Sequence, residues 1–341
     1  MKILSLANSL PSRIMTNADV LAEAIARNSH LPPLHLELLK RKLSDLLSDV
    51  GAQTRRRRAE GEKAVHLGTV AGERALQKSG LSPEEIDLLV YTSVSRGFIE
   101  PSTANVFQQT LGLERATCFD LLDACAGWIR GLEIVESLID KKNYRYAMLL
   151  SCEFNCEEYY PVIDSPEHLR DAVAGFTVGE AATATIVSAE PGEVSCSFSN
   201  VGAGSALCQI PLPNADQFCA ETWPTNRRPL QFYAQARALN SMAIDAVSEL
   251  FWRETSYAQQ SYDLVFGHSA GLPATRKVAQ RLKLDPRVCY EIFPEFGNTV
   301  SASIPLAMSL AEEDGSLQRG HRVLLVVGSA GITAALAALV F

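Results

Sequence analysis

The sequence of 341 residues lacks the features that mark several special classes of protein. Basic residues are not in excess, since the formal net charge is -8, and this argues against non-specific binding of nucleic acid. The apolar run at the N-terminus is too short for a secretion signal and is soon interrupted by Pro11 and Arg13. We therefore expect a cytoplasmic protein that binds neither nucleic acid nor a membrane.

An uninterrupted apolar run of membrane-spanning length is also missing. Residues 323–341 are strongly apolar, but Gly328, Ser329 and Gly331 divide them into two pieces of strand length. This pattern predicts a buried hairpin near the C-terminal end of the chain.

The eight cysteines show no spacing typical of a zinc site. Cys152, Cys156 and His168 could be grouped as metal ligands, but no second cysteine pair of suitable spacing follows. Because no secretion signal precedes them, we expect reduced thiols. We predict no disulfide, no metal and no bound cofactor.

Cys125 is the most informative residue that the sequence does contain. It lies between a strand-like segment and an amphipathic stretch that runs through Trp128, Leu132 and Val135. Unpaired N–H groups at a helix start favour a thiolate, and such positions lower a thiol pKa from about 8.5 toward roughly 3.5 to 7.5. A thiolate can take an acyl group from a thioester. We predict a nucleophile, and the alternative is a buried structural cysteine.

Two further polar residues also follow strand-like stretches. His268 ends the run 264–267, and Asn298 comes after residues 289–291 and a short connection. Taken alone, His268 would be a satisfied core histidine and Asn298 a helix N-cap. Together with Cys125 they form a candidate catalytic set, because functional residues gather at strand ends.

The chain repeats a pattern of segments in the same order. Residues 86–94 resemble 262–270, residues 118–120 parallel 289–291, and residues 144–150 parallel 321–327. Short apolar runs that alternate with amphipathic stretches predict buried strands covered by helices. We expect two similar α/β halves, 1–190 with the nucleophile and 191–341 with His268 and Asn298.

These motifs, in this order, resemble the β-ketoacyl synthase III-like condensing enzymes of the thiolase superfamily over essentially the whole chain. The motifs are the turn 124–127, His268 after a strand, the segment 297–305 and the closing segment 328–333. The resemblance implies the thiolase fold, with duplicated halves in a five-layer αβαβα arrangement. It also implies a homodimer, substrates that are acyl-CoA or acyl-carrier-protein thioesters, and an acyl carrier protein as a possible partner.

The resemblance also implies roles for particular residues. Cys125 would carry the acyl group, while His268 and Asn298 would hydrogen-bond the carbonyl oxygen of the second substrate and stabilise its enolate. The backbone N–H groups of Cys125 and Ala330 would form an oxyanion hole. One departure from the usual His-Gln-Ala-Asn pattern is the sequence of residues 268–271, His-Ser-Ala-Gly, which could alter carrier or acceptor preference.

Glu100 makes the resemblance to one group of these condensing enzymes more specific. Residues 91–104 look like the same segment in the enzymes that join two long acyl-CoAs head to head in olefin synthesis, where this glutamate crosses the dimer interface and serves as general base. A base is needed because an ordinary acyl thioester must lose an α-proton, whereas a malonyl thioester loses carbon dioxide instead. The alternative is a surface glutamate near a helix start. Phe98 and Ile99 are predicted to line the acyl pocket.

The favoured activity is therefore a Claisen condensation of the acyl group on Cys125 with a second acyl thioester, with Glu100 as base. Three alternatives stay open. They are decarboxylative condensation with malonyl-CoA or malonyl carrier protein in fatty acid or polyketide synthesis, acyl transfer to an alcohol or amine, and a role as a non-catalytic partner subunit. The basic run 55–58 is expected to pair with acidic neighbours, with contacts to a CoA phosphate as the alternative.

Overall fold

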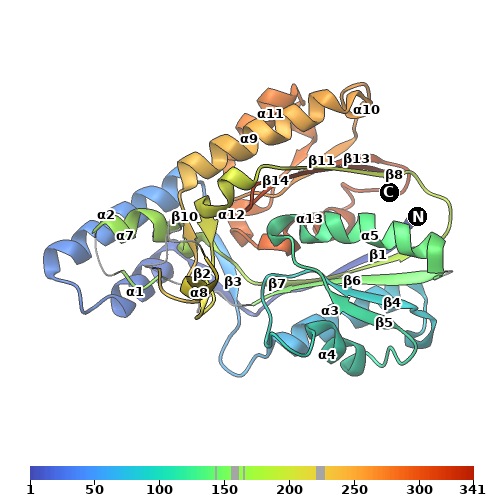
Figure 1. Cartoon of the computed structure of the whole chain (residues 1–341), viewed down its shortest axis with the longest axis horizontal. Helices are drawn as coiled ribbons and strands as arrows, with labels where there is room; N and C mark the ends of the chain where they lie inside the picture. The colour runs from blue at the N-terminus through green and yellow to red at the C-terminus, as the bar shows by residue number, and fades with distance from the viewer. Residues whose placement is uncertain (143, 155–160, 164–165, 220–226) are drawn as a thin grey trace.

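The computed structural model describes residues 1–142, 144–154, 161–163, 166–219 and 227–341. Two five-stranded sheets dominate it, and both have the same topology (Figure 1). The first sheet has the order β1 (Lys2–Ser9), β7 (Ala181–Ser188), β6 (Tyr146–Glu153), β4 (Leu88–Tyr91) and β5 (Thr117–Asp120). The second has the order β8 (Val194–Asn200), β14 (Thr333–Val340), β13 (Arg322–Ser329), β11 (Leu264–Gly267) and β12 (Cys289–Tyr290).

The strand directions also match between the sheets. In the first sheet β4 runs parallel to β5 and β6, and β7 is antiparallel to β6 and β1. In the second sheet β11 runs parallel to β12 and β13, and β14 is antiparallel to β13 and β8. The three sequence parallels thus fall on β4 and β11, β5 and β12, and β6 and β13, which confirms the predicted duplication. The domain limits 1–190 and 191–341 stay a prediction.

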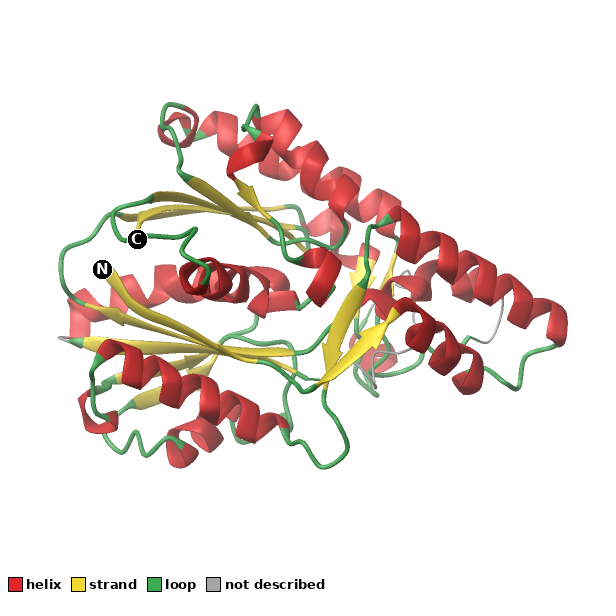
Figure 2. Ribbon diagram, turned by 180° about the vertical axis from the view of Figure 1, so that it is seen from behind, coloured by secondary structure: helices red, strands yellow, loops and turns green. Residues whose placement is uncertain are grey.

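Helices cover both faces of each sheet and complete five layers, seen edge-on in Figures 1 and 2. The outer helices α3 (Ala64–Ser79) and α4 (Thr103–Thr110) pack on the first sheet, and α9 (Ala236–Arg253) and α11 (Leu272–Leu282) pack on the second. Between the sheets lie α5 (Gly127–Lys142) and α13 (Ser303–Glu313). The predicted αβαβα arrangement is confirmed.

The central layer explains why the strands read as continuous apolar runs. Trp128, Leu132 and Val135 of α5 and Met308 of α13 are buried in one core with side chains from both sheets. A sheet that is covered on both faces has no solvent side, so its strands do not alternate between apolar and polar residues. All four residues of β4 are accordingly buried.

A smaller group of elements flanks the sheets at one end. It contains α1 (Asn17–Arg27), α2 (Pro33–Asp49), α7 (Pro166–Ala172), the strand pair β2 (Arg13–Thr16) and β3 (Thr54–Arg57), and the pair β9 (Cys208–Gln209) and β10 (Tyr233–Ala234). These elements share an apolar core of their own. The remaining short helices are α8 (Ala215–Phe218), α10 (Thr255–Ala258) and α12 (Phe293–Phe296), with 3-10 turns at 83–85, 124–126, 173–177, 202–207, 286–288 and 300–302.

Two expectations about apolar and basic runs are met. Strands β13 and β14 form the buried antiparallel hairpin expected near the C-terminal end, and no described helix is long and apolar enough to cross a membrane. In the basic run, the Arg57 guanidinium lies 2.6 Å from Glu23, and Arg58 pairs with Glu180. Arg55 is fully buried and donates to Asn17 Oδ1 at 2.8 Å. Pairing with acidic neighbours is therefore confirmed for Arg57 and Arg58.

Candidate active site

A cavity of about 320 Å³ lies where the carboxyl ends of the two sheets meet. Cys125, His268, Asn298 and Ala330 all line it, so the structure brings together four residues singled out from the sequence. Most of the remaining lining is apolar and comes from both halves and from the flanking elements, including Leu46, Val94, Leu122, Val178, Ile210, Phe232 and Leu239. An apolar cavity around a thiol, an imidazole and an amide suits an acyl substrate.

Cys125 sits in a strained turn at the start of α5. The turn 124–126 is a 3-10 turn, and Ala124 adopts a φ of 44°, in the left-handed region. Position 127, where the helix begins, requires glycine because a Cβ atom there would lie 2.4 Å from the Thr92 carbonyl oxygen. This close approach locks the helix start against the end of β4 and thereby positions the thiol.

The Cys125 thiol is not the preformed thiolate that its place at a helix start suggested. Burial raises its pKa well above the ordinary value, and the neighbouring Cys208 and Glu153 act in the same direction. Hydrogen bonds from Ser329 and from the backbone oppose the shift but do not reverse it. The prediction of a lowered pKa is therefore wrong, because desolvation outweighs the helix start.

His268 enters the cavity directly after β11. Its Nδ1 lies 2.9 Å from Ser303 Oγ, and the Ser303 hydroxyl donates to the Val300 carbonyl at 2.7 Å. Because the only hydroxyl hydrogen of Ser303 is used there, Ser303 must accept from Nδ1–H, which leaves Nε2 with a lone pair. Burial lowers the pKa of His268 to about 4, and a bond to the Val300 backbone opposes that shift. The site therefore holds a neutral imidazole that can accept a proton.

Asn298 is clamped between the two halves. Its N–H donates to the Thr177 carbonyl at 2.9 Å, and its carbonyl accepts from Gly179 N–H at 3.0 Å. Its side-chain Oδ1 accepts from the Val300 N–H at 2.9 Å. Only the oxygen of the amide can accept this bond, so the Nδ2 hydrogens are available to the cavity. Asn298 thus offers a donor where His268 offers an acceptor.

The proposed oxyanion hole is not open in the form that the sequence suggested. Ala330 lines the cavity, but the N–H of Cys125 already donates to Ser329 Oγ at 3.0 Å. Sequence reasoning gave Ser329 no role beyond dividing the C-terminal run. Its place at the end of β13 was the signal that could have identified it.

Glu153 is a second residue that sequence reasoning missed. This buried carboxylate ends β6 and accepts from Ser95 Oγ at 2.8 Å and from Ser301 Oγ at 2.6 Å. The N–H groups of Val94 and Ser95 donate to it at 3.1 Å. It thereby ties the segment after Asn298 to the first half. A carboxylate at the end of a parallel strand was the available signal.

The loop with Phe98, Ile99 and Glu100 lies outside the cavity of its own chain. Phe98 and Ile99 are 54% and 80% exposed, and Glu100 is also exposed. Asp120 at the end of β5 holds the loop there, since its carboxylate accepts from the N–H groups of Thr103 and the next residue at 2.8 Å. The expectation that Phe98 and Ile99 line the acyl pocket therefore does not hold within one chain.

The segment 268–271, which departs from the family pattern, lies beside two adjoining cavities. Ser269 is buried and bonds Thr275 at 2.9 Å, so its hydroxyl supports α11. Ala270, Ala243 and Gly328 line both the main cavity and a second, smaller one beside His268. Small side chains thus leave room at the junction of the two cavities.

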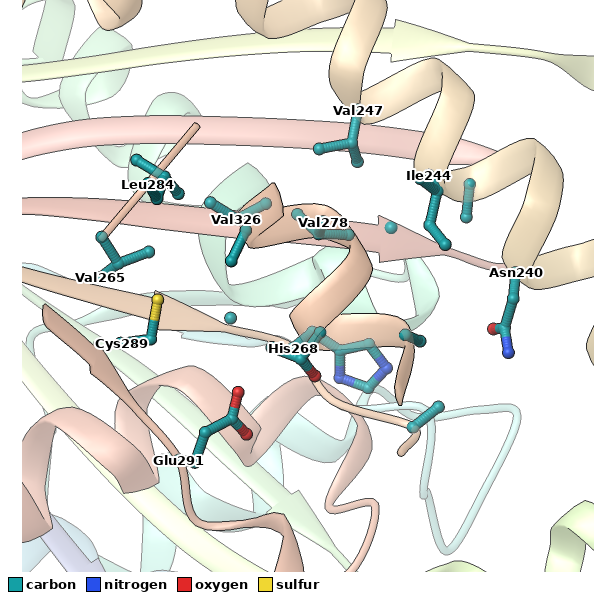
Figure 3. Close-up of a pocket in the computed structure, with 17 residues that line it drawn as sticks. Asn240, Ile244, Val247, Val265, His268, Val278, Leu284, Cys289, Glu291 and Val326 are labelled. Atoms are coloured by element: carbon teal, nitrogen blue, oxygen red, sulfur yellow. The ribbon is translucent and has the colours of Figure 1, made fainter. Parts of the chain in front are cut away.

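The second cavity, of about 70 Å³, is an apolar slot between α9, α11 and the second sheet (Figure 3). Six branched aliphatic side chains line it, namely Ile244, Val247, Val265, Val278, Leu284 and Val326. Cys289 and Glu291 also lie along it, and burial raises the pKa of Glu291 to about 7. At roughly 15 Å³ for each water-sized group, the slot holds a short alkyl segment.

No group of three or more His, Cys, Asp or Glu side chains is placed to hold a metal ion among the residues that the structure describes. Of the three ligands considered from the sequence, Cys152 is buried and donates to the Ala64 carbonyl, and His168 stacks on Tyr233. Cys156 lies outside the described residues.

A duplicated five-layer fold with a cysteine at the start of the central helix defines the class of thiolase-fold enzymes. A family model described as 3-oxoacyl-[acyl-carrier-protein (ACP)] synthase III C terminal matches residues 253–341. β-Ketoacyl-[acyl-carrier-protein] synthase III from Clostridium beijerinckii is 25% identical, over 97% of this chain and 96% of that protein. The enzyme of that name from Campylobacter jejuni is 27% identical, over 96% and 94%.

Solved structures agree in fold over the whole chain. OleA from Xanthomonas campestris superposes with a TM-score of 0.83 at 23% identity, covering 100% of this chain and 98% of that one. FabH from Xanthomonas oryzae gives 0.82 at 23%, with the same coverage. The family model and the sequence relatives thus show that the chain is similar to the β-ketoacyl synthase III-like condensing enzymes, which are acyltransferases, and the solved structures show that it shares their fold.

Proposed function

We propose that this enzyme joins two acyl thioesters by a Claisen condensation that needs no decarboxylation. The observation that carries the proposal is the apolar slot beside His268, which adjoins the main cavity. Two acyl chains require two apolar compartments that meet at the reacting carbons. A malonyl thioester would instead place a carboxylate at the mouth of an aliphatic slot, and burying an unpaired charge there is costly.

In the first step, Cys125 takes an acyl group. His268 accepts the thiol proton at Nε2 as the sulfur attacks the thioester carbonyl carbon. The C–S bond to CoA or carrier protein breaks, and the departing sulfur receives that proton. A neutral imidazole and a protonated thiol are the resting forms that such a coupled transfer requires, and burial favours both.

In the second step, another acyl thioester enters with its carbonyl oxygen near the Nδ2 group of Asn298. A base removes its α-proton, and the amide donor stabilises the enolate oxygen. The α-carbon attacks the Cys125 thioester, the bond between that carbonyl carbon and the Cys125 sulfur breaks, and a β-ketoacyl thioester is released. The proton that the base removed returns to the Cys125 sulfur. One solved OleA structure of the same fold contains lauric acid and lauroyl-CoA, which supports an acyl thioester as substrate, while the slot beside His268 has room for a short alkyl segment.

We assign the base to Glu100 of a second copy of the chain. Within one chain Glu100 is exposed and held beside β5, the last strand of its sheet in the described structure. Phe98, Ile99 and Leu122 expose large apolar surfaces there, and Leu122, 60% exposed, also lines the main cavity. A two-fold pairing along this edge would cover these side chains and bring each loop to the partner's cavity.

The decisive experiment follows the products of a mixture of acyl-CoAs by mass spectrometry, with and without malonyl-CoA. A Cys125-dependent β-keto product that contains both acyl chains, formed without malonyl-CoA and without carbon dioxide, is expected. A product that forms only with malonyl-CoA would favour the decarboxylative reaction, which the names of the sequence relatives also suggest. An ester or amide product would indicate acyl transfer to an alcohol or amine, and an unacylated Cys125 would favour a non-catalytic subunit.

A mixing experiment tests the place of Glu100. Cys125→Ala and Glu100→Gln are each expected to be inactive in condensation, although Glu100→Gln should still be acylated. After subunit exchange, an equal mixture should recover about a quarter of wild-type activity, because half of randomly paired dimers hold one intact site of two. No recovery, with exchange verified by differently tagged chains, would place the base in the same chain or elsewhere. The choice between CoA and carrier protein and the cytoplasmic location stay predictions.

A further inference from the structure

Ser329 is the polar side chain nearest to the nucleophile that the mechanism above leaves without a task. It is the last residue of β13, only 2% exposed, and it lines the main cavity. Its Oγ accepts the N–H of Cys125 at 3.0 Å, across a separation of 204 residues. Within the described part of the chain, the Ser329 hydroxyl hydrogen faces the Cys125 sulfur, and this bond lowers the pKa of the thiol.

These bonds change what a substrate meets at Cys125. A carbonyl oxygen that approaches the Cys125 N–H finds that donor already engaged. The hydroxyl that engages it has one hydrogen, which faces the Cys125 sulfur, and a carbonyl oxygen on the carbon that this sulfur attacks comes within reach of the same hydrogen. A hydroxyl that accepts one hydrogen bond becomes a better donor in the next, since chains of hydrogen bonds polarise one another.

We propose that the Ser329 hydroxyl is a catalytic oxyanion donor of the acylation step. It donates to the thioester carbonyl oxygen as the Cys125 sulfur attacks, while the Cys125 N–H polarises it from behind. The carbon–sulfur bond to Cys125 forms, negative charge collects on the carbonyl oxygen, and collapse expels the CoA sulfur. Ser329 keeps its proton throughout, and its bond strengthens as the charge develops.

The inference rests on the proposed acylation of Cys125, so the test must separate the two. Acylation by an acyl-CoA passes through an oxyanion, whereas alkylation of the same thiol by iodoacetamide does not. Ser329→Ala should therefore acylate about 10²- to 10³-fold more slowly, as when one oxyanion donor is removed, and alkylate within a few-fold of wild type. Ser309→Ala is the control, because Ser309 is a buried hydroxyl bonded to Asn8 away from the cavity.

A second pair of variants separates the loss of the hydroxyl from a folding defect in Ser329→Ala. Ser329→Thr and Ser329→Val share a shape and differ only in the hydroxyl, so they share any steric cost. The threonine variant should retain acylation and the valine variant should lose it, at equal melting temperatures and at alkylation rates within a few-fold of each other, since the hydroxyl also lowers the pKa of the thiol. The proposal would be overturned if Ser329→Ala were acylated as fast as the wild type, or Ser329→Val as fast as Ser329→Thr. Ser329 would then be a group that blocks the Cys125 N–H. A wild-type enzyme that no acyl-CoA acylates would instead refute the proposed function.

Discussion

The resting thiol of Cys125 is predicted to be protonated at neutral pH, and the structure lets two opposing effects be compared. The helix start is worth about 0.3 to 2 kcal/mol, or roughly 0.2 to 1.5 pKa units in favour of thiolate. Burial raises the pKa of an acidic group by up to about 3 to 5 units. Glu153 and Cys208 add to the burial effect. Burial wins, so the thiolate fraction at pH 7 falls below the few per cent of an ordinary cysteine with a pKa near 8.5.

Iodoacetamide alkylation measured from pH 6 to pH 9.5 tests this comparison. Intact mass follows the modification, and Cys125→Ala gives the background from the other cysteines. The logarithm of the Cys125 rate should rise with a slope near one per pH unit and reach no plateau by about pH 9, since the pKa lies above the ordinary range. A plateau with a midpoint below about pH 8 would refute the reasoning and indicate a thiolate paired with a charged imidazole.

Three further predictions concern stability and positioning. The unfolded state binds a proton that buried His268 resists until its pKa of about 4, so His268 should lower the unfolding free energy by about 3 kcal/mol from pH 6.5 to pH 4. Urea titrations should show this amount as a difference between the wild type and His268→Gln, because Glu291, whose raised pKa acts in the opposite direction, is present in both. Gly127→Ala should destabilise the fold by about 1 to 3 kcal/mol and slow acylation, whereas Gly202→Ala, with nothing within 4 Å of the new Cβ, should change neither. Glu153→Gln should lower the unfolding free energy by about 1 to 3 kcal/mol, measured by calorimetry, because the new amide hydrogens face donors such as Ser301. The same variant should shift the Cys125 alkylation curve to lower pH, because the charge of Glu153 raises the pKa of the thiol. Wild-type stability and an unmoved curve would argue against the role given to this carboxylate.

Much of the architecture was predictable because it depends on local pattern and repetition. Continuous apolar runs predicted strands covered on both faces, and the three segment parallels predicted two sheets of one topology. The resemblance to the condensing enzymes implied that Cys125, His268 and Asn298 meet, and all three line one cavity. Cys125 follows a strand of one sheet while His268 and Asn298 follow strands of the other, so the local pattern alone would not have brought them together.

The place of the loop at Glu100 was not predictable from one chain alone. The sequence suggested that Phe98 and Ile99 line a pocket, but Asp120 holds their loop on the outside of the first sheet. Apolar residues next to a glutamate look the same in a sequence whether they face the chain's own cavity or a partner. Only the tertiary arrangement separates these cases.

The sequence by itself determined which groups could do the chemistry, and the tertiary structure decided their protonation and their hydrogen-bond partners. The helix start visible in the sequence suggested a thiolate, but burial among residues distant in the chain keeps the thiol protonated. The free nitrogen of His268 is set by Ser303, and the Cys125 N–H is taken by Ser329. Protonation and hydrogen bonding depend on desolvation and on distances of about 3 Å between groups far apart in the chain, and no local pattern encodes such distances.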